Sequence, residues 1–461
     1  MALIQRRGQR YPRQLGEQVP LNFIQRDHDW ADGTTARTSG RRRRWPAAAA
    51  IAALTLLAAG CASSASTGSG STAASTNSTG FTDGQVRLAS TYPVSLSGPN
   101  QMLGYAAYFN YINQTQGGVK MANGKRYKIV FKYEDDGYDT GRAVANIKSF
   151  IATFHPAAII GMTGSAINLA TIGLLDQANI PDMYSSEGDD FWQQDVSKYP
   201  MFGPTQDPSD NLWMASQLAY IKSTWPGAKL ALLAQNDAYG QDIVNAVKND
   251  IKGTGLTLAA TQWYNTGAPS VSTQVAALAA TDATVFINTS LPPALTQSIE
   301  YAKTISWNVP DFICYSCANS SVLQPAGAAA NNIYAPLVDV DPSIPQWGST
   351  PAVTTLKNIV AKYGPTGASS SSPEDLDGAA FAELVVENLE ASQPNSQSLI
   401  NTMRHQGNTY DPLLLPGTSV STSPTYPYYV NKLTIAQYHL ATNSWTMLAK
   451  PFTDPTYHAA G

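Results

Sequence analysis

Short apolar segments alternate with longer amphipathic segments along most of this chain, and this alternation limits the possible folds more than any other feature. In the first run the sequence predicts strands at 85–92, 127–133, 157–162 and 180–184, with helices at 98–116, 140–154 and 166–178. After Pro204 the pattern restarts, with strands at 229–234, 256–264, 284–288 and 311–315 and helices at 209–224, 241–253, 272–280 and 294–305. Strands separated by helices indicate βαβ units and parallel sheets. The sequence therefore predicts an α/β fold with two doubly wound lobes.

The C-terminal part adds three predicted helices, at 352–363, 375–390 and 396–405, and two β-like segments, at 432–440 and 444–448. These strands are too few for a third lobe, so we expect them to complete the first two. The predicted boundaries are 85–204 and 336–414 for the first lobe, and 205–335 and 415–452 for the second. Hinge crossings are expected near 203–204, 334–336 and 412–416, where proline or glycine limits the backbone.

The N-terminal part reads as an export signal. Four arginines at 41–44 precede an apolar run at 47–59, which is shorter than the roughly twenty residues that a membrane span needs. The run ends in Leu57-Ala58-Ala59-Gly60-Cys61, which resembles a bacterial lipobox, although a plain signal peptide cut nearby is the alternative. We expect a signal peptide at 1–60, lipidation of Cys61, and a flexible linker at 61–84 that is rich in Ser, Thr and Gly. The folded part would then lie outside the cytoplasm, anchored to the outer face of the cell membrane.

The charge of the folded part argues against nucleic acid as a partner. The whole chain has a formal charge of −4, but ten of its 29 basic residues and only four of its 33 acidic residues lie in 1–60. The remainder therefore carries −10, and an acidic surface has no attraction for phosphate backbones.

The stretch 157–168 is the first candidate binding element. It reads as an apolar strand, a turn with two glycines, and the start of a helix. A helix N-terminus leaves backbone N–H groups unpaired and carries partial positive charge, so it suits a carboxylate, with Thr163 and Ser165 adding hydroxyl groups. The alternative is an ordinary turn in which Ser165 caps its own helix.

Ordered motifs from about residue 85 to 450 resemble the branched-chain amino acid (Leu/Ile/Val) binding-protein family of ABC importers, in a lipoprotein form with a type I periplasmic-binding fold. The motifs are Ser95-Leu96-Ser97-Gly98-Pro99, Asn113 with Gly117-Gly118-Val119, Tyr133-Glu134-Asp135-Asp136, Ile159-Ile160-Gly161 through Ser165, Ile180-Pro181, Asp237-Ala238-Tyr239-Gly240-Gln241 and the closing segment 433–445.

The resemblance implies an extracytoplasmic solute-binding protein that delivers a small ligand to an ABC permease, without a cofactor. It places the ligand between the lobes, in contact with Thr163, Gly164, Ser165, Ser185, Ser186 and Glu187 of the first lobe and Tyr239, Ser290 and Ser316 of the second. These residues follow strand ends, where open α/β sheets bind ligands. The implied ligand bears a carboxylate: a branched-chain or related amino acid, an amide or an organic acid.

One departure from the family concerns the ligand, and a pair of cysteines is a separate feature. The segment around Ser316 lacks the acidic residue that would receive a ligand ammonium group. Either Glu187 supplies that charge or the ligand is not an α-amino acid, because an unpaired buried ammonium group is costly. Cys314 and Cys317 favour a disulfide over free thiols in an exported protein, provided that a tight turn at 315–316 brings them together.

Other functions have less support. The sequence contains no G-x-S-x-G, H-E-x-x-H or phosphate-binding G-x-x-x-x-G-K-[ST] motif, and no cluster that suggests a metal site, so we expect no enzyme. A surface hydrolase is the alternative from another class. A ligand sensor that signals to a membrane receptor is the alternative among binding proteins.

Overall fold

The computed structural model describes residues 78–454, with the exception of 83, 99, 195 and 408. The predicted signal peptide, the lipobox with Cys61 and most of the predicted linker lie outside the described residues. The chain divides into Met1–Ala74 and Ser75–Gly461, and everything that follows concerns the second unit. None of the helices in its described part is both long and apolar enough to cross a membrane.

The first lobe is built on a sheet of six strands within the described residues. Their bounds are β1 Phe81–Thr82, β2 Gln85–Tyr92, β3 Val119–Lys120, β4 Arg126–Asp135, β5 Ala158–Ile160 and β6 Asp182–Met183. The order is β3-β4-β2-β5-β6, with β1 beside β2. The strands β4, β2, β5 and β6 are parallel, whereas β1 and β3 pair antiparallel to their neighbours.

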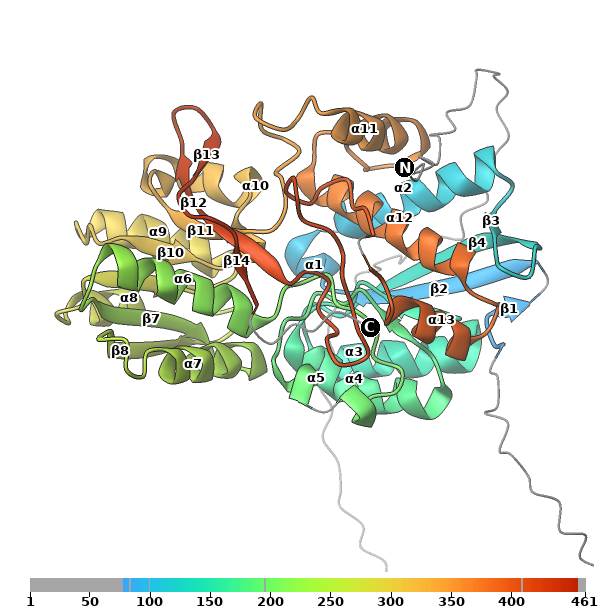
Figure 1. Cartoon of the computed structure of the whole chain (residues 1–461), viewed down its shortest axis with the longest axis horizontal. Helices are drawn as coiled ribbons and strands as arrows, with labels where there is room; N and C mark the ends of the chain where they lie inside the picture. Colours follow the sequence, from blue (N-terminus) through green and yellow to red (C-terminus); the bar gives the residue numbers. More distant parts are fainter. Residues whose placement is uncertain (1–77, 83, 99, 195, 408, 455–461) are drawn as a thin grey trace, which may run out of the picture. The chain divides into compact units, whose positions relative to one another are not determined.

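The second lobe is built on a sheet of eight described strands. Their bounds are β7 Lys229–Gln235, β8 Thr257–Tyr264, β9 Val285–Asn288, β10 Asp311–Ile313, β11 Tyr334–Leu337, β12 Lys432–His439, β13 Ser444–Met447 and β14 Phe452–Thr453. The order is β13-β12-β11-β10-β9-β7-β8, with β14 beside β12. The strands from β8 to β11 are parallel, and β12 adds an antiparallel edge, visible in red beside β11 in Figure 1.

The helices connect and cover these strands. Their bounds are α1 Val94–Ser97, α2 Asn100–Thr115, α3 Thr140–Ser149, α4 Ser165–Ala178, α5 Phe191–Gln194, α6 Asp210–Thr224, α7 Ala238–Asp250, α8 Ser272–Ala279, α9 Ala294–Thr304, α10 Ser320–Leu323, α11 Pro351–Tyr363, α12 Pro373–Ala391 and α13 Ser396–Met403. Although α12 is distant in sequence, it packs along α2 of the first lobe, and Gly104 and Gly378 allow the approach because a Cβ at either would lie 2.0 Å from a carbonyl oxygen of the other helix.

This architecture confirms the predicted α/β fold with two doubly wound lobes. In the first sheet, β2 has β4 on one side and β5 on the other. In the second sheet, β7 has β8 on one side and β9 on the other. The order reverses between β2 and β5 in one sheet and between β7 and β9 in the other, and ligands bind at such points in open α/β sheets.

Within the described residues, three segments connect the lobes: 205–209, 338–350 and 404–431. The second and third run antiparallel, because the Val340 N–H donates to the Leu413 carbonyl (2.7 Å) and the Leu415 N–H to the Val338 carbonyl (2.9 Å). The first is tied to the third where the Thr205 N–H donates to the Pro427 carbonyl at 2.8 Å.

The crossing predicted near 334–336 starts further along the chain, because these residues belong to β11. Pro336 pairs with Ile435 of β12, and Phe312 of β10 pairs with Tyr334 at the start of the strand. A proline in a short segment argues against a strand in the sequence. Here β11 lies between β10 and β12, but its pairing with β10 is limited to Tyr334, so Pro336 lies beyond that ladder and pairs with β12 alone. The crossing begins only after Leu337.

Candidate functional site

The turn after β5 has the conformation that its two glycines require. Gly161 and Gly164 have φ angles of 62° and 104°, in the left-handed region that disfavours other residues. A Cβ on Gly164 would also lie 2.9 Å from the ring of Tyr138, so a side chain has no room. The turn delivers Thr163 to a cavity that lies between the lobes. The Thr163 hydroxyl is buried and has no partner among the described residues.

Ser165 does not cap its own helix. It is the first residue of α4, the N-cap is Gly164, and the Ser165 hydroxyl donates to Glu187 Oε1 at 3.0 Å. The same oxygen accepts the Asp189 N–H at 2.7 Å. Glu187 is 2% exposed, and burial, followed by repulsion from Asp189, raises its pKa well above the usual range. Glu187 and Ser165 therefore bond to each other and do not line the cavity.

The loop after β6 runs beside the turn after β5. The Gly164 N–H donates to the Ser186 carbonyl (3.1 Å) and the Ser186 N–H donates to the Met162 carbonyl (2.7 Å). This pairing places the Ser186 side chain in the cavity, where its hydroxyl donates to Asp207 Oδ2 at 3.1 Å, whereas Ser185 is buried away from it.

In the second lobe, the predicted residues separate into one at the cavity and two behind it. Ser316 is exposed and lines the cavity. Tyr239, at the start of α7, directs its hydroxyl to the Thr289 carbonyl at 3.4 Å. Ser290 is fully buried and donates to Asn288 Oδ1 at 2.5 Å. Neither Tyr239 nor Ser290 is among the described lining residues.

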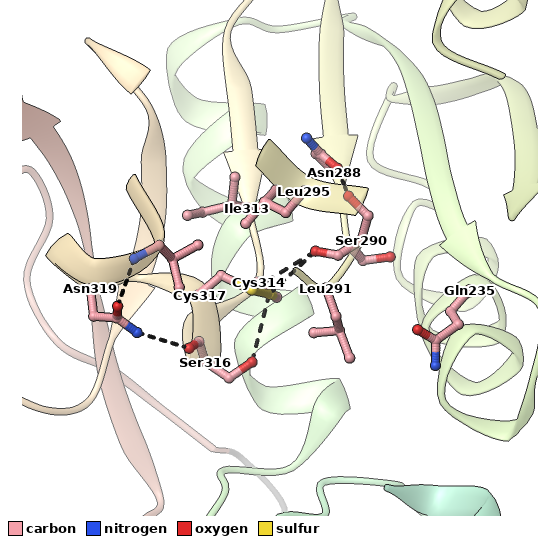
Figure 2. Close-up of a disulfide and its surroundings, with 12 residues drawn as sticks. Gln235, Asn288, Ser290, Leu291, Leu295, Ile313, Cys314, Ser316, Cys317 and Asn319 are labelled. Atoms are coloured by element: carbon pink, nitrogen blue, oxygen red, sulfur yellow. Dashed lines mark hydrogen bonds between the residues drawn. A yellow bond between two sulfur atoms is a disulfide. The ribbon is translucent and has the colours of Figure 1, made fainter. Parts of the chain in front are cut away.

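A disulfide joins Cys314 and Cys317 directly after β10 (Figure 2). The strand stops at Ile313, and a 3-10 turn at Tyr315–Cys317 brings the two Cα atoms to 5.5 Å. An extended strand would hold them too far apart. Both sulfurs lie within 4.0 Å of the Ser290 carbonyl oxygen, so the loop is fixed against the neighbouring strand end. Ser316 stands at its tip.

The cavity has a volume of about 230 Å³ and is lined from both lobes and from the crossings. Of the predicted ligand-binding residues, it brings together Thr163, Ser186 and Ser316. It also contains residues that sequence reasoning missed: Tyr92, Gln101, Gln206, Asp207, Tyr315, Ala318, Asn319, Leu337, Val338, Asp339, Val340, Asp341, Pro342, Pro373, Glu374, Asp377, Phe381 and Leu413. The alternation Val338-Asp339-Val340-Asp341 is one signal that could have been noticed, but Glu374 and Asp377 look like ordinary acids of a surface helix.

The missed residues make the cavity acidic. Five carboxylates line it, and among its described lining residues there is no Lys, Arg or His. Burial raises the pKa of Asp207 to about 7, and burial together with the charge of Asp207 raises the pKa of Asp377 to about 7. The pKa of Asp339 is raised well above its usual range by burial and by the charges of Asp411, Asp377 and Asp207. The described residues contain no group of three or more His, Cys, Asp or Glu side chains arranged to hold a metal ion.

Known proteins share both the sequence pattern and the fold. The family model described as periplasmic binding protein matches residues 88–437. A branched chain amino acid ABC transporter protein from Thermus thermophilus with bound valine is 16% identical, with a TM-score of 0.67 over 80% of this chain and 97% of that chain. A fatty acid ABC transporter substrate-binding protein from Thermomonospora curvata is 18% identical, with a TM-score of 0.65 over 83% and 97%. No curated protein sequence matches the chain. The family match covers most of the sequence, and the chain therefore belongs to the periplasmic binding protein family.

Proposed function

We propose that this protein is the solute-binding lipoprotein of an ABC importer, and that it captures a small carboxylate-bearing ligand between its lobes. The observation that carries the proposal is the cavity of about 230 Å³, which has polar side chains from the strand ends of both sheets. The solved structures with this fold include proteins described as binding valine or serving fatty acid transport, so the fold accepts ligands of different polarity.

Ligand capture would proceed by hinge closure, as in other periplasmic binding proteins. A ligand that touches Thr163 and Ser186 on one lobe and Ser316 on the other has its full set of contacts only when the lobes are together. It therefore shifts the population toward the closed form by its difference in affinity for the two forms. The closed form would dock on the permease, and the lipid at Cys61 would keep it at the membrane.

A binding screen tests this proposal directly. The purified protein would be heated with amino acids, amides and small organic acids, and the unfolding temperature recorded. A ligand at a hundred times its dissociation constant adds about 2.7 kcal/mol to the free energy of unfolding, which is readily detected. A panel without any stabilising compound would contradict the proposal.

Thr163→Val sharpens the screen, because valine keeps the shape and removes only the unpartnered hydroxyl. We expect ligand binding to weaken by about 0.5–1.5 kcal/mol, measured by isothermal titration calorimetry. Thr304→Val is the matched control, since Thr304 lies on α9 and its hydroxyl donates to the Glu300 carbonyl at 2.9 Å. Equal ligand affinities of the two variants would show that the Thr163 hydroxyl does not contact the ligand.

A further inference from the structure

Two carboxylates of the cavity have an oxygen that no described donor reaches. Asp377 accepts from Gln101 Nε2 through Oδ2 (2.8 Å), and Asp339 accepts from the Tyr429 hydroxyl through Oδ1 (2.7 Å). Their other oxygens have no hydrogen-bond donor among the described residues. Both residues line the cavity, so a ligand that displaces water from these oxygens has to supply donors in its place.

Two other acids of the cavity show the contrast. Asp341 accepts from the Ser320 N–H through Oδ2 (2.6 Å) and from the Ser343 N–H through Oδ1 (2.9 Å). Glu374 accepts from the Ser321 hydroxyl through Oε1 and from the Ser372 hydroxyl through Oε2. Asp341 and Glu374 are thus occupied by the protein itself, so the unused acceptors belong to Asp339 and Asp377.

An independent observation comes from an unpartnered donor in the same cavity. Gln206 is only 5% exposed, and its Oε1 accepts from Gln101 Nε2 at 2.7 Å. Its Nε2 is buried and has no acceptor among the described residues, although Gln206 lines the cavity. A buried amide donor without an acceptor is destabilising, so this group indicates a ligand oxygen. The unpartnered hydroxyl of Thr163 indicates the same.

We infer that the ligand is a cation: it presents a carboxylate or carbonyl oxygen to Gln206 and Thr163, and it carries more basic nitrogens than carboxylates. One protonated nitrogen binds Asp339 and Asp377. This inference rests on the proposed function and narrows its ligand class. An organic acid would leave these carboxylates without compensation, and a branched-chain amino acid brings no net positive charge to a cavity lined by five carboxylates. Charge-assisted hydrogen bonds to the two free oxygens would supply that compensation.

Three ligands with the same six-carbon chain test the charge requirement. Lysine carries two amines and one carboxylate, norleucine lacks the side-chain amine, and hexanoate lacks both amines. Calorimetric titration of the purified protein with these compounds, together with ornithine, arginine and putrescine as further cations, compares net charges of different sign. We expect the tightest binding from a cation, at least tenfold tighter than norleucine and hexanoate.

The outcomes separate the two proposals. Norleucine or hexanoate binding as tightly as every cation would overturn the inference and leave the solute-binding function standing. If none of these compounds and none of the wider screen binds, both the function and the inference fail.

Asp377→Asn tests the residue. The asparagine keeps an oxygen for Gln101 and removes one negative charge, so the fold should be retained, with an unfolding temperature no lower than that of the unmodified protein. We expect the cationic ligand to bind about 10- to 100-fold more weakly, with little change for norleucine. Asp339→Asn should act in the same direction. Glu300→Gln, at an exposed position of α9, removes the same charge at a distance and should change nothing. An equal loss for lysine and norleucine, or no loss for either, would overturn the assignment.

Discussion

Two groups of acids lie where the lobes meet, and they differ in what surrounds them. Three of the five carboxylates that line the cavity, which we call the cavity acids, are Asp207, Asp339 and Asp377. The interlobe acids are Glu187, Asp189 and Asp190 from the loop after β6, Asp210 from α6 and Asp242 from α7. Neither group has a basic residue among the described hydrogen-bond partners of its carboxylates.

Several carboxylates of the interlobe acids accept hydrogen bonds from protein groups, although Glu187 Oε2 and Asp210 Oδ2 are buried without a described partner. The Asp190 N–H donates to Asp242 Oδ2 at 3.1 Å, and the Asn211 N–H donates to Asp190 Oδ1 at 3.3 Å. Trp213 Nε1 donates to Asp210 Oδ1 at 2.8 Å. A hydrogen bond between the Asp189 and Asp242 carboxyl groups requires that the pair share a proton. The comparison teaches that two clusters of similar charge differ in access: Asp339 and Asp377 line the cavity, where a ligand can reach them, whereas Glu187 and Asp210 are buried away from it.

Stability should fall as the pH rises, and this is the largest expected effect. Burial raises the pKa of Asp190 to about 8 and that of Asp207 and Asp377 to about 7, so these groups hold protons in the folded chain that the unfolded chain has lost. Their stabilising contribution is complete below about pH 4 and disappears as the pH passes through 7 to 8. Between about pH 4 and its raised pKa, each such group lowers the unfolding free energy by about 1.4 kcal/mol per pH unit. Urea unfolding at pH 5, 6, 7 and 8 measures the slope, and a stability that is constant or rises would contradict the raised pKa values.

Gly188→Ala should disturb the interlobe group alone. A Cβ at Gly188 would lie 2.6 Å from the Pro208 carbonyl oxygen and 2.8 Å from Asp210 Oδ1, so α6 could not keep its approach to this loop. We expect a loss of about 1–3 kcal/mol in the free energy of unfolding, measured with urea. The control is Gly173→Ala on α4, where no atom lies within 4 Å of the added Cβ and the helix gains stability. Similar results for the two variants would show that the contact at Gly188 is not close.

Asp242→Asn should have the smallest effect on stability, and it should change the interlobe acids without changing ligand binding at the cavity acids. The amide can donate to Asp189 without a shared proton, while its oxygen still accepts the Asp190 N–H. At pH 8 we expect a gain of about 1 kcal/mol in unfolding free energy, because burial and Asp189 raise the pKa of Asp242 to about 7. The preference for cationic over neutral ligands should remain as in the unmodified protein, unlike in Asp377→Asn. A changed preference would mean that the two groups act as one.

The elements of the fold were largely predictable because each carries its own local pattern. The alternation of apolar runs and amphipathic helices identified most of the strands and helices, and the glycines at 161 and 164 marked the turn after β5. β11 was missed because Pro336 looks like a break and the strand is buried only through its neighbours β10 and β12. Its identity depends on pairing, which a single segment does not encode.

The site was less predictable than the fold. Motif position identified Thr163, Ser186 and Ser316, which follow strands and line the cavity. Asp207, Asp339 and Asp377 come from two crossings and one helix, and nothing local relates them. They meet only because the chain crosses between the lobes repeatedly, so their shared surroundings arise from tertiary structure. The same holds for Glu187, whose loop position suggests solvent contact but whose carboxylate receives the Ser165 hydroxyl.

The paired crossings would also shape the closure proposed above. Residues 338–340 and 413–415 form a short two-stranded ribbon, joined by hydrogen bonds of 2.7 and 2.9 Å. Such a ribbon bends easily across its plane, but sliding one strand along the other would break the bonds. We therefore expect bending across this ribbon to be the easiest motion of the lobes. In the proposed closure a ligand would then select one bending angle, and the hinge itself would lose little conformational entropy.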